Sequence, residues 1–353
     1  MTAHPPALPH SPPATLEHEL QDLYLRGTPA NTLRAYERDL VYIRAWRKAR
    51  FDGDLAWPEA EEVALRFVLD HARDLSEAAM DDPVRQATEA LIAAGLRRAL
   101  SPPAPSTLDR RIASWRAFHR MRNLASPFDA PLLRQARAKA RRALARPVVK
   151  KSANPVMRDV LEALMAACGP DADGSPLRGL RDRAILAVAW ASGGRRRAEI
   201  AGLSRKDVDL GDFDVKGLIW LRLFSTKTTG AEATPTLVVK GRAARALVAW
   251  IDAAHIEDGP LFRPISKAGR VLRRPLSADG IRLVMRRRLE ATGLDPNFAS
   301  PHGLRSGFLT QAALDGVPVQ AAMRLSLHRS VAQAQRYYDD VEITVNPATD
   351  LLD

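Results

Sequence analysis

Residues 301–338 read PHGLRSGFLTQAALDGVPVQAAMRLSLHRSVAQAQRYY, and the polar residues in this stretch stand at informative spacings. His302 and Arg305 are three residues apart, so one face of a predicted helix presents both side chains. His328 follows twenty-three residues after Arg305, and Tyr337 follows nine residues after His328. None of these residue types indicates a function by itself. The inference therefore rests on their order and spacing.

Two segments upstream carry further polar residues in a defined structural context. The segment SGGRRRAEIAGL over 192–203 follows an apolar helix, which Gly193 and Gly194 break, and it places Arg196 three residues ahead of Glu199. The runs GLIWLRLF over 217–224 and TPTLVV over 234–239 have the composition of strands. We expect them to form a hairpin within an otherwise helical domain.

These segments resemble the conserved boxes of tyrosine recombinases, the phage integrases, firmly over residues 155–340. In that family an arginine box precedes a hairpin whose mobile lysine reaches the scissile phosphate, and a His-x-x-Arg box, a histidine and a tyrosine follow. The resemblance implies that the catalytic residues are Arg196, Lys227, His302, Arg305, His328 and Tyr337.

Two assignments keep a rival, and two positions depart from the family pattern. Lys227 lies in the turn FSTKTTG and Lys240 follows the second strand, so Lys240 is the rival lysine; Tyr338 is the rival of Tyr337. Leu327 stands before His328 where the family usually has glycine, and Arg195 occupies a position that is often hydrophobic. Neither departure removes a catalytic group.

The residue types suit the cleavage of a DNA phosphodiester. Two guanidiniums can each donate in a planar fork to the phosphoryl oxygens, and two histidines add donors to the same developing charge. A tyrosine hydroxyl has a reference pKa of about 10 and needs a base or a cationic pocket to attack. His302 is the expected base, and the family resemblance implies that Lys227 protonates the leaving 5′ oxygen. We expect no cofactor, because arginines supply the charge that a metal brings elsewhere and the covalent intermediate replaces ATP.

Composition agrees with a polyanionic partner. The 353 residues include 53 Lys and Arg against 41 Asp and Glu, a net charge of +12. A coding bias towards Arg and Ala is the alternative explanation for part of this excess of basic residues. The single cysteine, Cys168, excludes an intrachain disulfide and a thiolate cluster for zinc. No run of 18 or more apolar residues and no signal peptide is present, so we expect a cytoplasmic protein that contacts no membrane.

The first third of the chain predicts a helical DNA-binding domain. Residues 15–130 carry helical apolar periodicity, and STLDRRIASWRAFHRMR over 106–122 combines an apolar stripe with arginines. Residues 131–153 are strongly basic and predict a connector that follows DNA phosphates. The DNA-binding candidates are Arg110, Arg111, Arg116, Arg120, Arg141, Arg142 and Arg146. The alternative for the arginine-rich helix is a solvated surface.

The expected architecture is mainly α with a small antiparallel β hairpin in the C-terminal domain, folded as the two-domain C-shaped clamp of tyrosine recombinases. We expect a disordered leader at 1–14, too short for an additional arm-binding domain, a core-binding domain at 15–130, a linker at 131–153 and a catalytic domain at 154–342. The tail at 343–353 is expected to dock on a neighbouring protomer. The predicted partners are double-stranded DNA with an inverted-repeat core site and further copies of the chain, two per site and four in the synapse.

Two other functions compete with this interpretation. A type IB topoisomerase or a telomere resolvase uses a similar residue set, but the chain length with one helical domain ahead of the catalytic one favours a recombinase. A catalytically inactive DNA-binding protein is the alternative from another class. It is disfavoured because every catalytic position is filled.

Overall fold

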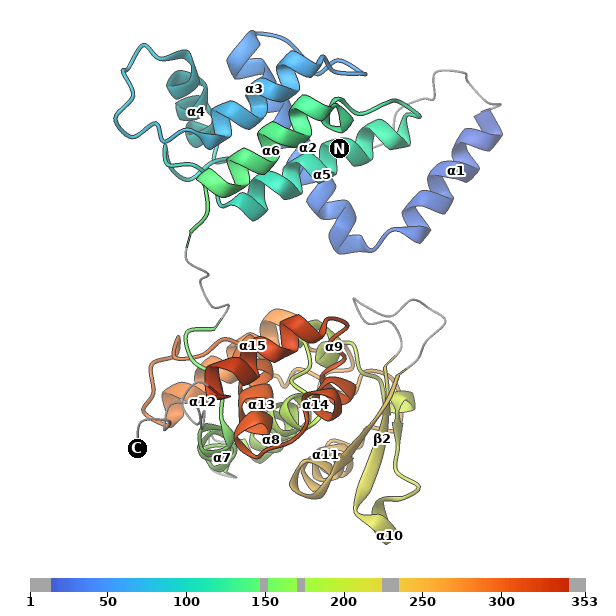
Figure 1. Ribbon diagram of the computed structural model, residues 1–353. Coiled ribbons are helices and arrows are strands. Elements are labelled where there is room, and N and C mark those ends of the chain that lie inside the picture. The colour runs from blue at the N-terminus through green and yellow to red at the C-terminus, as the bar shows by residue number, and fades with distance from the viewer. Residues whose placement is uncertain (1–13, 147–151, 170–174, 224–234, 343–353) are drawn as a thin grey trace, which may run out of the picture. The chain divides into compact units, whose positions relative to one another are not determined.

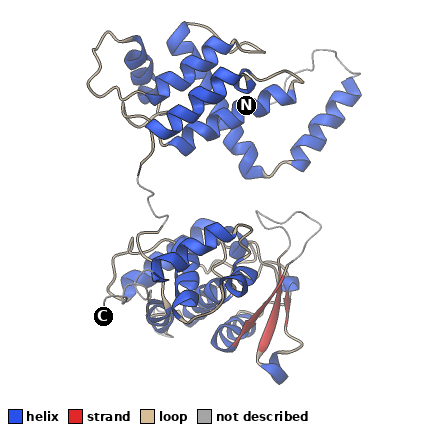
Figure 2. Ribbon diagram, in the orientation of Figure 1, coloured by secondary structure: helices blue, strands red, loops and turns tan. Residues whose placement is uncertain are grey.

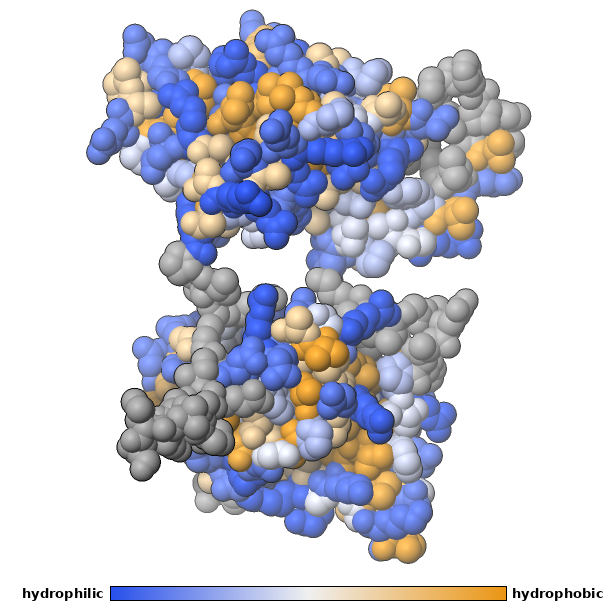
Figure 3. Space-filling model, in the orientation of Figure 1, coloured by the Kyte–Doolittle hydropathy of each residue, from blue (hydrophilic) through white to orange (hydrophobic). Residues whose placement is uncertain are grey.

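The computed structural model describes residues 14–146, 152–169, 175–223 and 235–342. The chain divides into two compact units, Met1–Val148 and Val149–Asp353. Helices make up most of both units, and strands occur at one side of the second unit (Figure 2). Hydrophilic side chains cover most of the visible face of each unit (Figure 3). None of the described helices is long and apolar enough to cross a membrane.

The first unit is a cluster of helices around an aromatic core (Figure 1). Its described helices are α1 (Ala14–Gly27), α2 (Ala30–Phe51), α3 (Glu61–Ala72), α4 (Pro83–Ala93), α5 (Pro105–Met121) and α6 (Pro131–Ala143), with the 3-10 turn η1 (Pro127–Asp129). Trp46 of α2, Phe67 of α3 and Trp115 of α5 meet edge to face, with ring centroids 4.9 to 6.5 Å apart. This packing joins α5 to the consecutive helices α2 and α3.

The connector predicted at 131–153 starts too early in the sequence, because its first residues belong to the first unit. The predicted end of the helical domain at residue 130 is therefore corrected. Residues Pro131–Ala143 form α6, which packs on α3, and Leu133, Ala140 and Leu144 are buried in the core. This segment has few apolar residues at helical spacing and many arginines on its other faces, so the sequence pattern did not reveal the helix. The basic stretch is therefore a helix of the first unit up to Ala143. Residues 147–151 lie outside the described part.

The second unit surrounds α8, a helix whose C-terminal half is apolar. Its helices are α7 (Arg158–Ala166), α8 (Pro176–Ala191), α9 (Arg197–Ala201), α10 (Phe213–Lys216), α11 (Gly241–Ala253), α12 (Ala278–Ala291), α13 (His302–Leu314), α14 (Val319–Ser326) and α15 (Val331–Glu342), with the 3-10 turn η3 (Arg205–Asp207). Residues 184–189 of α8 are all buried, and α7, α11 and α13 pack around it. A helix buried on every side becomes the centre of its domain.

A three-stranded antiparallel sheet completes this unit. The strands are β1 (Val208–Asp209), β2 (Leu218–Arg222) and β3 (Thr236–Lys240), in the order β1-β2-β3. The register pairs Leu218 with Lys240 and Arg222 with Thr236, which confirms the predicted hairpin. The short strand β1 was not expected, because two residues are too few for a visible alternation. The prediction of a mainly helical chain with a small antiparallel sheet is confirmed.

A buried charge cluster links three elements of the second unit. Asp182 of α8 and Arg288 of α12 are both 0% exposed. Arg288 donates to Asp182 Oδ2 from Nε and Nη2, at 3.0 and 2.7 Å, and Arg181 donates to Oδ1 from Nε and Nη2, at 2.9 and 2.7 Å. Arg288 also donates to the Ala167 carbonyl at the end of α7. One carboxylate thus accepts hydrogen bonds from two buried guanidiniums.

We predict that Asp182→Asn lowers the free energy of unfolding of the second unit by about 3 kcal/mol or more. The substitution removes the buried carboxylate that accepts from both guanidiniums. Calorimetry of the full chain should show a lower midpoint for this unit's transition. The control is Asp209→Asn, which breaks an ion pair with Arg222 at 3.7 Å between side chains that are about half exposed. Equal stability losses in the two variants would contradict the role given to Asp182.

Candidate active site

Helix α13 presents His302 at its first turn, and the start of the second unit holds this end of the helix in place. The backbone N–H of Val156 donates to the Gly303 carbonyl at 2.8 Å. The Ser300 N–H donates to Ser152 Oγ at 2.9 Å, and Asn154 Nδ2 donates to the Phe298 carbonyl at 2.9 Å. Asn154 does not cap α7, because that helix begins at Arg158. The asparagine instead ties this segment to the loop before His302.

The Gly193–Gly194 turn packs against two other segments of the site. Both glycines have positive φ, at 89° and 68°. A Cβ on Gly194 would lie 2.1 Å from the Arg305 Cα, and a Cβ on Gly193 would lie 2.3 Å from the Leu325 carbonyl carbon. The Gly194 carbonyl also accepts a hydrogen bond from Arg305 Nη1 at 3.3 Å. Only glycines allow this turn to contact α13 and the end of α14 together.

Arg196 follows the turn at the start of α9 and pairs with Glu199. Arg196 Nη1 lies 2.8 Å from Glu199 Oε1, and the Arg196 N–H donates to Oε2 at 3.3 Å. The Arg196 side chain is 36% exposed, whereas the Glu199 side chain is 8% exposed. The carboxylate therefore holds the arginine at one end and leaves it accessible to a ligand. Glu199 is therefore the structural partner of Arg196.

Arg305 and His328 lie against each other although they are far apart in the sequence. Arg305 Nη2 is 3.0 Å from His328 Nδ1, and Arg305 Nε donates to His328 Nε2 at 3.2 Å. Ser326 Oγ lies 2.8 Å from Nδ1 of the same ring. The chain reverses between Ser326 and His328 at Leu327, which adopts the left-handed conformation with φ 53°. The end of α14 thus aims the imidazole at the guanidinium of α13.

The two adjacent tyrosines of α15 have different surroundings. The Tyr337 hydroxyl lies 3.4 Å from His302 Nε2, and its ring centroid is 6.4 Å from that of His328. Tyr338 is buried, and its hydroxyl donates to the Val317 carbonyl at 2.9 Å. Burial raises the pKa of Tyr338 above its ordinary value. The geometry therefore favours Tyr337 over Tyr338 as a nucleophile.

The buried arginines set the electrostatics of this cluster. Burial, followed by the charges of Arg305, Arg196 and Arg195, lowers the pKa of His328 to about 3. Burial also lowers the pKa of Arg305 to about 10, and its neighbours Arg195 and Arg196 add to that effect. A neutral imidazole can accept from Arg305, whereas an imidazolium carries only donors. The site is therefore strongly positive and holds His328 uncharged at neutral pH.

The predicted lysine lies outside the described residues, but its rival can be placed. Lys227 falls within 224–234, which the structure does not describe. Lys240 pairs with Leu218 in the register, at the end of the hairpin opposite the turn. Lys240 lies about 13 Å along β3 from Thr236, the paired residue nearest the turn, at roughly 3.3 Å per residue. Lys240 therefore lies outside the turn, and Lys227 stays a prediction.

The DNA-binding candidates of the first unit differ in their accessibility. Arg111 is buried, and its guanidinium lies 3.2 Å from the centre of the Tyr42 ring, so its selection as a DNA contact is corrected. The cation–π contact uses the arginine within the core. Arg110 pairs with Asp39, and Arg116 pairs with Asp129. The remaining candidates are exposed; they are Arg120, Arg141, Arg142 and Arg146.

Sequence reasoning missed three contributors to the cluster. Ser326 contacts His328, the Gly194 carbonyl accepts from Arg305, and Arg195 Nη2 donates to the Leu325 carbonyl at 2.8 Å. The glycine pair was interpreted only as a helix break. The two glycines pack closely against segments that are far away in the sequence. The sequence pattern contains no information on such contacts. The unusual Arg195 was visible but had no assigned partner.

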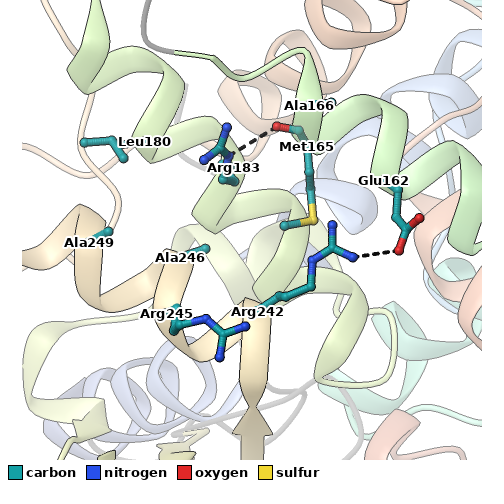
Figure 4. Close-up of a pocket in the computed structure, with 9 residues that line it drawn as sticks. All are labelled: Glu162, Met165, Ala166, Leu180, Arg183, Arg242, Arg245, Ala246 and Ala249. Carbon is teal, nitrogen blue, oxygen red and sulfur yellow. Dashed lines mark hydrogen bonds and ion pairs between the residues drawn. The ribbon is translucent and has the colours of Figure 1, made fainter. Parts of the chain in front are cut away.

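A pocket of about 440 Å³ lies elsewhere in the second unit, between α7, α8 and α11 (Figure 4). Arg242 donates to Glu162 across its edge at 2.7 Å, and Arg183 Nε donates to the Met165 carbonyl at 3.2 Å. None of the predicted site residues lines it. The reactive cluster is therefore separate from this pocket.

Comparisons with known proteins agree on one family. The model of the phage integrase family matches residues 156–342. The tyrosine recombinase XerC of Pelotomaculum thermopropionicum is 32% identical over 241 residues, which cover 66% of this chain and 70% of that protein. The integrase/recombinase XerD homolog of Selenomonas ruminantium is 26% identical over 321 residues, which cover 89% of this chain and 82% of that protein.

Solved structures of low sequence identity share the fold. The Tn1549 transposon integrase in complex with transposon right end DNA is 13% identical with a TM-score of 0.56, covering 94% of this chain and 98% of that one. A lambda integrase dimer bound to a COC′ core site is 18% identical with a TM-score of 0.51, covering 92% and 76%. At these identities the likeness concerns the fold alone.

We predict that His328 stays neutral throughout the range from pH 7.5 to pH 5. The unfolded chain binds a proton at this histidine near pH 6.5 and the folded chain only near pH 3, so its burial opposes folding increasingly as the pH falls through that window. Side-chain ¹⁵N NMR of the full chain should show no titration of its ring nitrogens, with His328→Asn used to assign the signals. A titration step near pH 6.5 would refute the depressed pKa.

Proposed function

The chain belongs to the phage integrase family and is a site-specific tyrosine recombinase, and on that premise we propose how its side chains cut and rejoin DNA. We propose that Tyr337 attacks the scissile phosphate. The observation that carries this assignment is the 3.4 Å separation of the Tyr337 hydroxyl from His302 Nε2, while Tyr338 is tied to a backbone carbonyl. A catalytic hydrogen bond is often long in the free enzyme and tightens when the substrate binds.

The arginine cluster stabilises the negative charge that develops on the phosphorus oxygens. Arg305 is held rigidly by Gly194 and lies against His328, and Arg196 is held at one end by Glu199. Donors that are fixed before the reaction need no reorganisation in the transition state. The Tyr337 hydroxyl gives up its proton as it attacks phosphorus. His302 accepts that proton.

Cleavage then proceeds by a balanced exchange of bonds. A bond forms between the Tyr337 oxygen and phosphorus as the bond between phosphorus and the 5′ oxygen breaks, and Lys227 supplies the proton to the departing oxygen. The products are a 3′-phosphotyrosine and a free 5′ hydroxyl. Because one phosphodiester bond replaces another, the 5′ hydroxyl of a second strand can reverse the step. Rejoining therefore requires no ATP.

Both units are proposed to contact DNA, with two protomers on an inverted-repeat core site and four in the synapse. The net charge of +12 supports a polyanionic partner, and the exposed arginines of α6 are available to phosphates. The similar lambda integrase is a dimer on a core site, which supports the pairing of protomers. The tail at 343–353 is proposed to contact the neighbouring protomer. It lies outside the described residues.

We predict that Tyr337→Phe abolishes covalent protein–DNA adducts, because the substitution removes only the attacking hydroxyl. Fragments of DNA flanking the encoding gene are first incubated with the full chain, and covalent ends are sequenced to map the cleavage site. Nicked suicide substrates built on that site then compare the variants. Tyr338→Phe is the matched control and should retain adduct formation, with some loss of stability. The assignment fails if Tyr337→Phe forms adducts and Tyr338→Phe does not.

We also predict that Arg196→Lys slows cleavage by about a hundredfold while half-site binding changes little. Lysine keeps the charge but replaces a planar fork of donors by a point charge at the phosphoryl oxygens. The control is Arg197→Lys, the next residue, whose exposed side chain pairs with Asp279 at 2.9 Å. Single-turnover cleavage on the suicide substrate provides the rates. Equal rates for the Arg196 and Arg197 variants would remove Arg196 from the mechanism.

A further inference from the structure

Arg195 is a buried arginine that joins two segments of the catalytic cluster. The residue is 2% exposed and stands between the Gly193–Gly194 turn and Arg196. Its Nη2 donates to the Leu325 carbonyl at 2.8 Å, and its Nη1 lies 3.6 Å from Glu199 Oε2. Glu199 thus faces Arg195 through one oxygen and Arg196 through the other. The side chain connects the arginine loop to the helix that leads into His328.

The charge of Arg195 is only partly compensated. Among the described residues, its Nε and Nη1 have no hydrogen-bond partner. Burial lowers the pKa of Arg195 to about 10, Glu199 opposes that shift and Arg196 adds to it. An apolar side chain of similar volume would pack here without this desolvation penalty. Packing alone therefore does not account for a guanidinium at this position.

The Leu325 carbonyl belongs to the last turn of α14, where carbonyl groups lack helical partners. A cation at the C-terminus of a helix also complements the helix dipole. The chain leaves α14 through Ser326, whose hydroxyl contacts His328, and through Leu327 in the left-handed conformation. The bond from Arg195 therefore fixes the point from which His328 is presented.

We propose that Arg195 is a positioning residue for DNA cleavage, holding His328 against Arg305 through the end of α14 and holding Arg196 through the shared Glu199. This inference rests on the proposed function of the cluster. Arg195 acts through these neighbours, because its own side chain is buried. Its absence should slow the chemical step without weakening DNA binding.

The electrostatic surroundings of His328 give a second readout. The charged and titratable groups that face the ring are Arg305 and His302 of α13, Arg195 and Arg196 of the loop before α9, and Tyr337 of α15. The positive charge of Arg195 is one of the causes of the depressed pKa of His328. Removing Arg195 should raise that pKa. A residue that only filled space would leave it unchanged.

The test compares Arg195→Met with Arg263→Met in the full chain. Arg263 is also a buried arginine, it donates from Nε to the Pro260 carbonyl at 2.8 Å, and it contacts no residue of the catalytic cluster in the described structure. Both variants lose arginine bonds to backbone carbonyls, so both should lose stability. Cleavage of the suicide substrate and half-site affinity are measured well below both unfolding midpoints. Side-chain ¹⁵N NMR follows His328.

We expect Arg195→Met to cleave at least about tenfold more slowly than the wild type, with half-site affinity unchanged within about threefold and a raised pKa of His328. Arg263→Met should cleave at the wild-type rate. If Arg195→Met does not fold, Arg195→Lys replaces it; lysine cannot serve both Leu325 and Glu199, so cleavage should slow by about threefold or more.

The inference is overturned if the Arg195 variant cleaves at the wild-type rate, or if Arg263→Met slows cleavage as much as Arg195→Met does. An unchanged pKa of His328 would also count against it. If the wild-type chain itself forms no covalent adduct on the DNA that flanks its gene, the proposed function fails instead. The two failures are therefore distinguishable.

Discussion

The contact of the Gly193–Gly194 turn with the Arg305 backbone and the Leu325–Ser326 peptide is the constraint on which the catalytic cluster depends. Any side chain at these two positions would overlap backbone atoms of α13 or of the end of α14. Because the turn is this close, the Gly194 carbonyl reaches Arg305 and the next two residues reach Leu325 and Glu199. A single turn therefore sets the relative positions of Arg196, Arg305 and His328.

The guanidiniums of the catalytic cluster repel one another, so the surrounding fold must be stable enough to hold them together. Burial and the charge of Arg196 lower the pKa of Arg195, and burial and the charges of Arg195 and Arg196 lower the pKa of Arg305. Glu199 is the carboxylate that pairs with Arg195 and Arg196. The apolar helix α8 and the charge cluster of Asp182 supply stability away from the site. A free enzyme with unneutralised donors is poised for an anion, and a phosphate supplies the missing negative charge.

The sequence indicated which residues the proposed site contains, but not the contacts that orient them. The resemblance of their spacing to that of tyrosine recombinases pointed to His302, Arg305, His328 and Tyr337, and a change of period pointed to the hairpin. Both signals are local in the sequence. The partners Ser326 and Gly194 were missed because they depend on packing between distant segments. Arg111 was misassigned because an arginine that stacks on a core tyrosine has the same helical position as a solvated one. Helix α6 was hidden by its arginine content.

The most direct test of this account is to identify the residue that carries the DNA after cleavage. The full chain is reacted with a suicide substrate, the DNA is trimmed by nuclease and the protein is digested with trypsin. Fragmentation by mass spectrometry then locates the remaining nucleotide within the peptide that begins at Tyr337. The account predicts a nucleotide joined through its 3′ phosphate to the Tyr337 oxygen. A nucleotide on Tyr338 or on another residue, or a 5′ phosphate linkage, would contradict it.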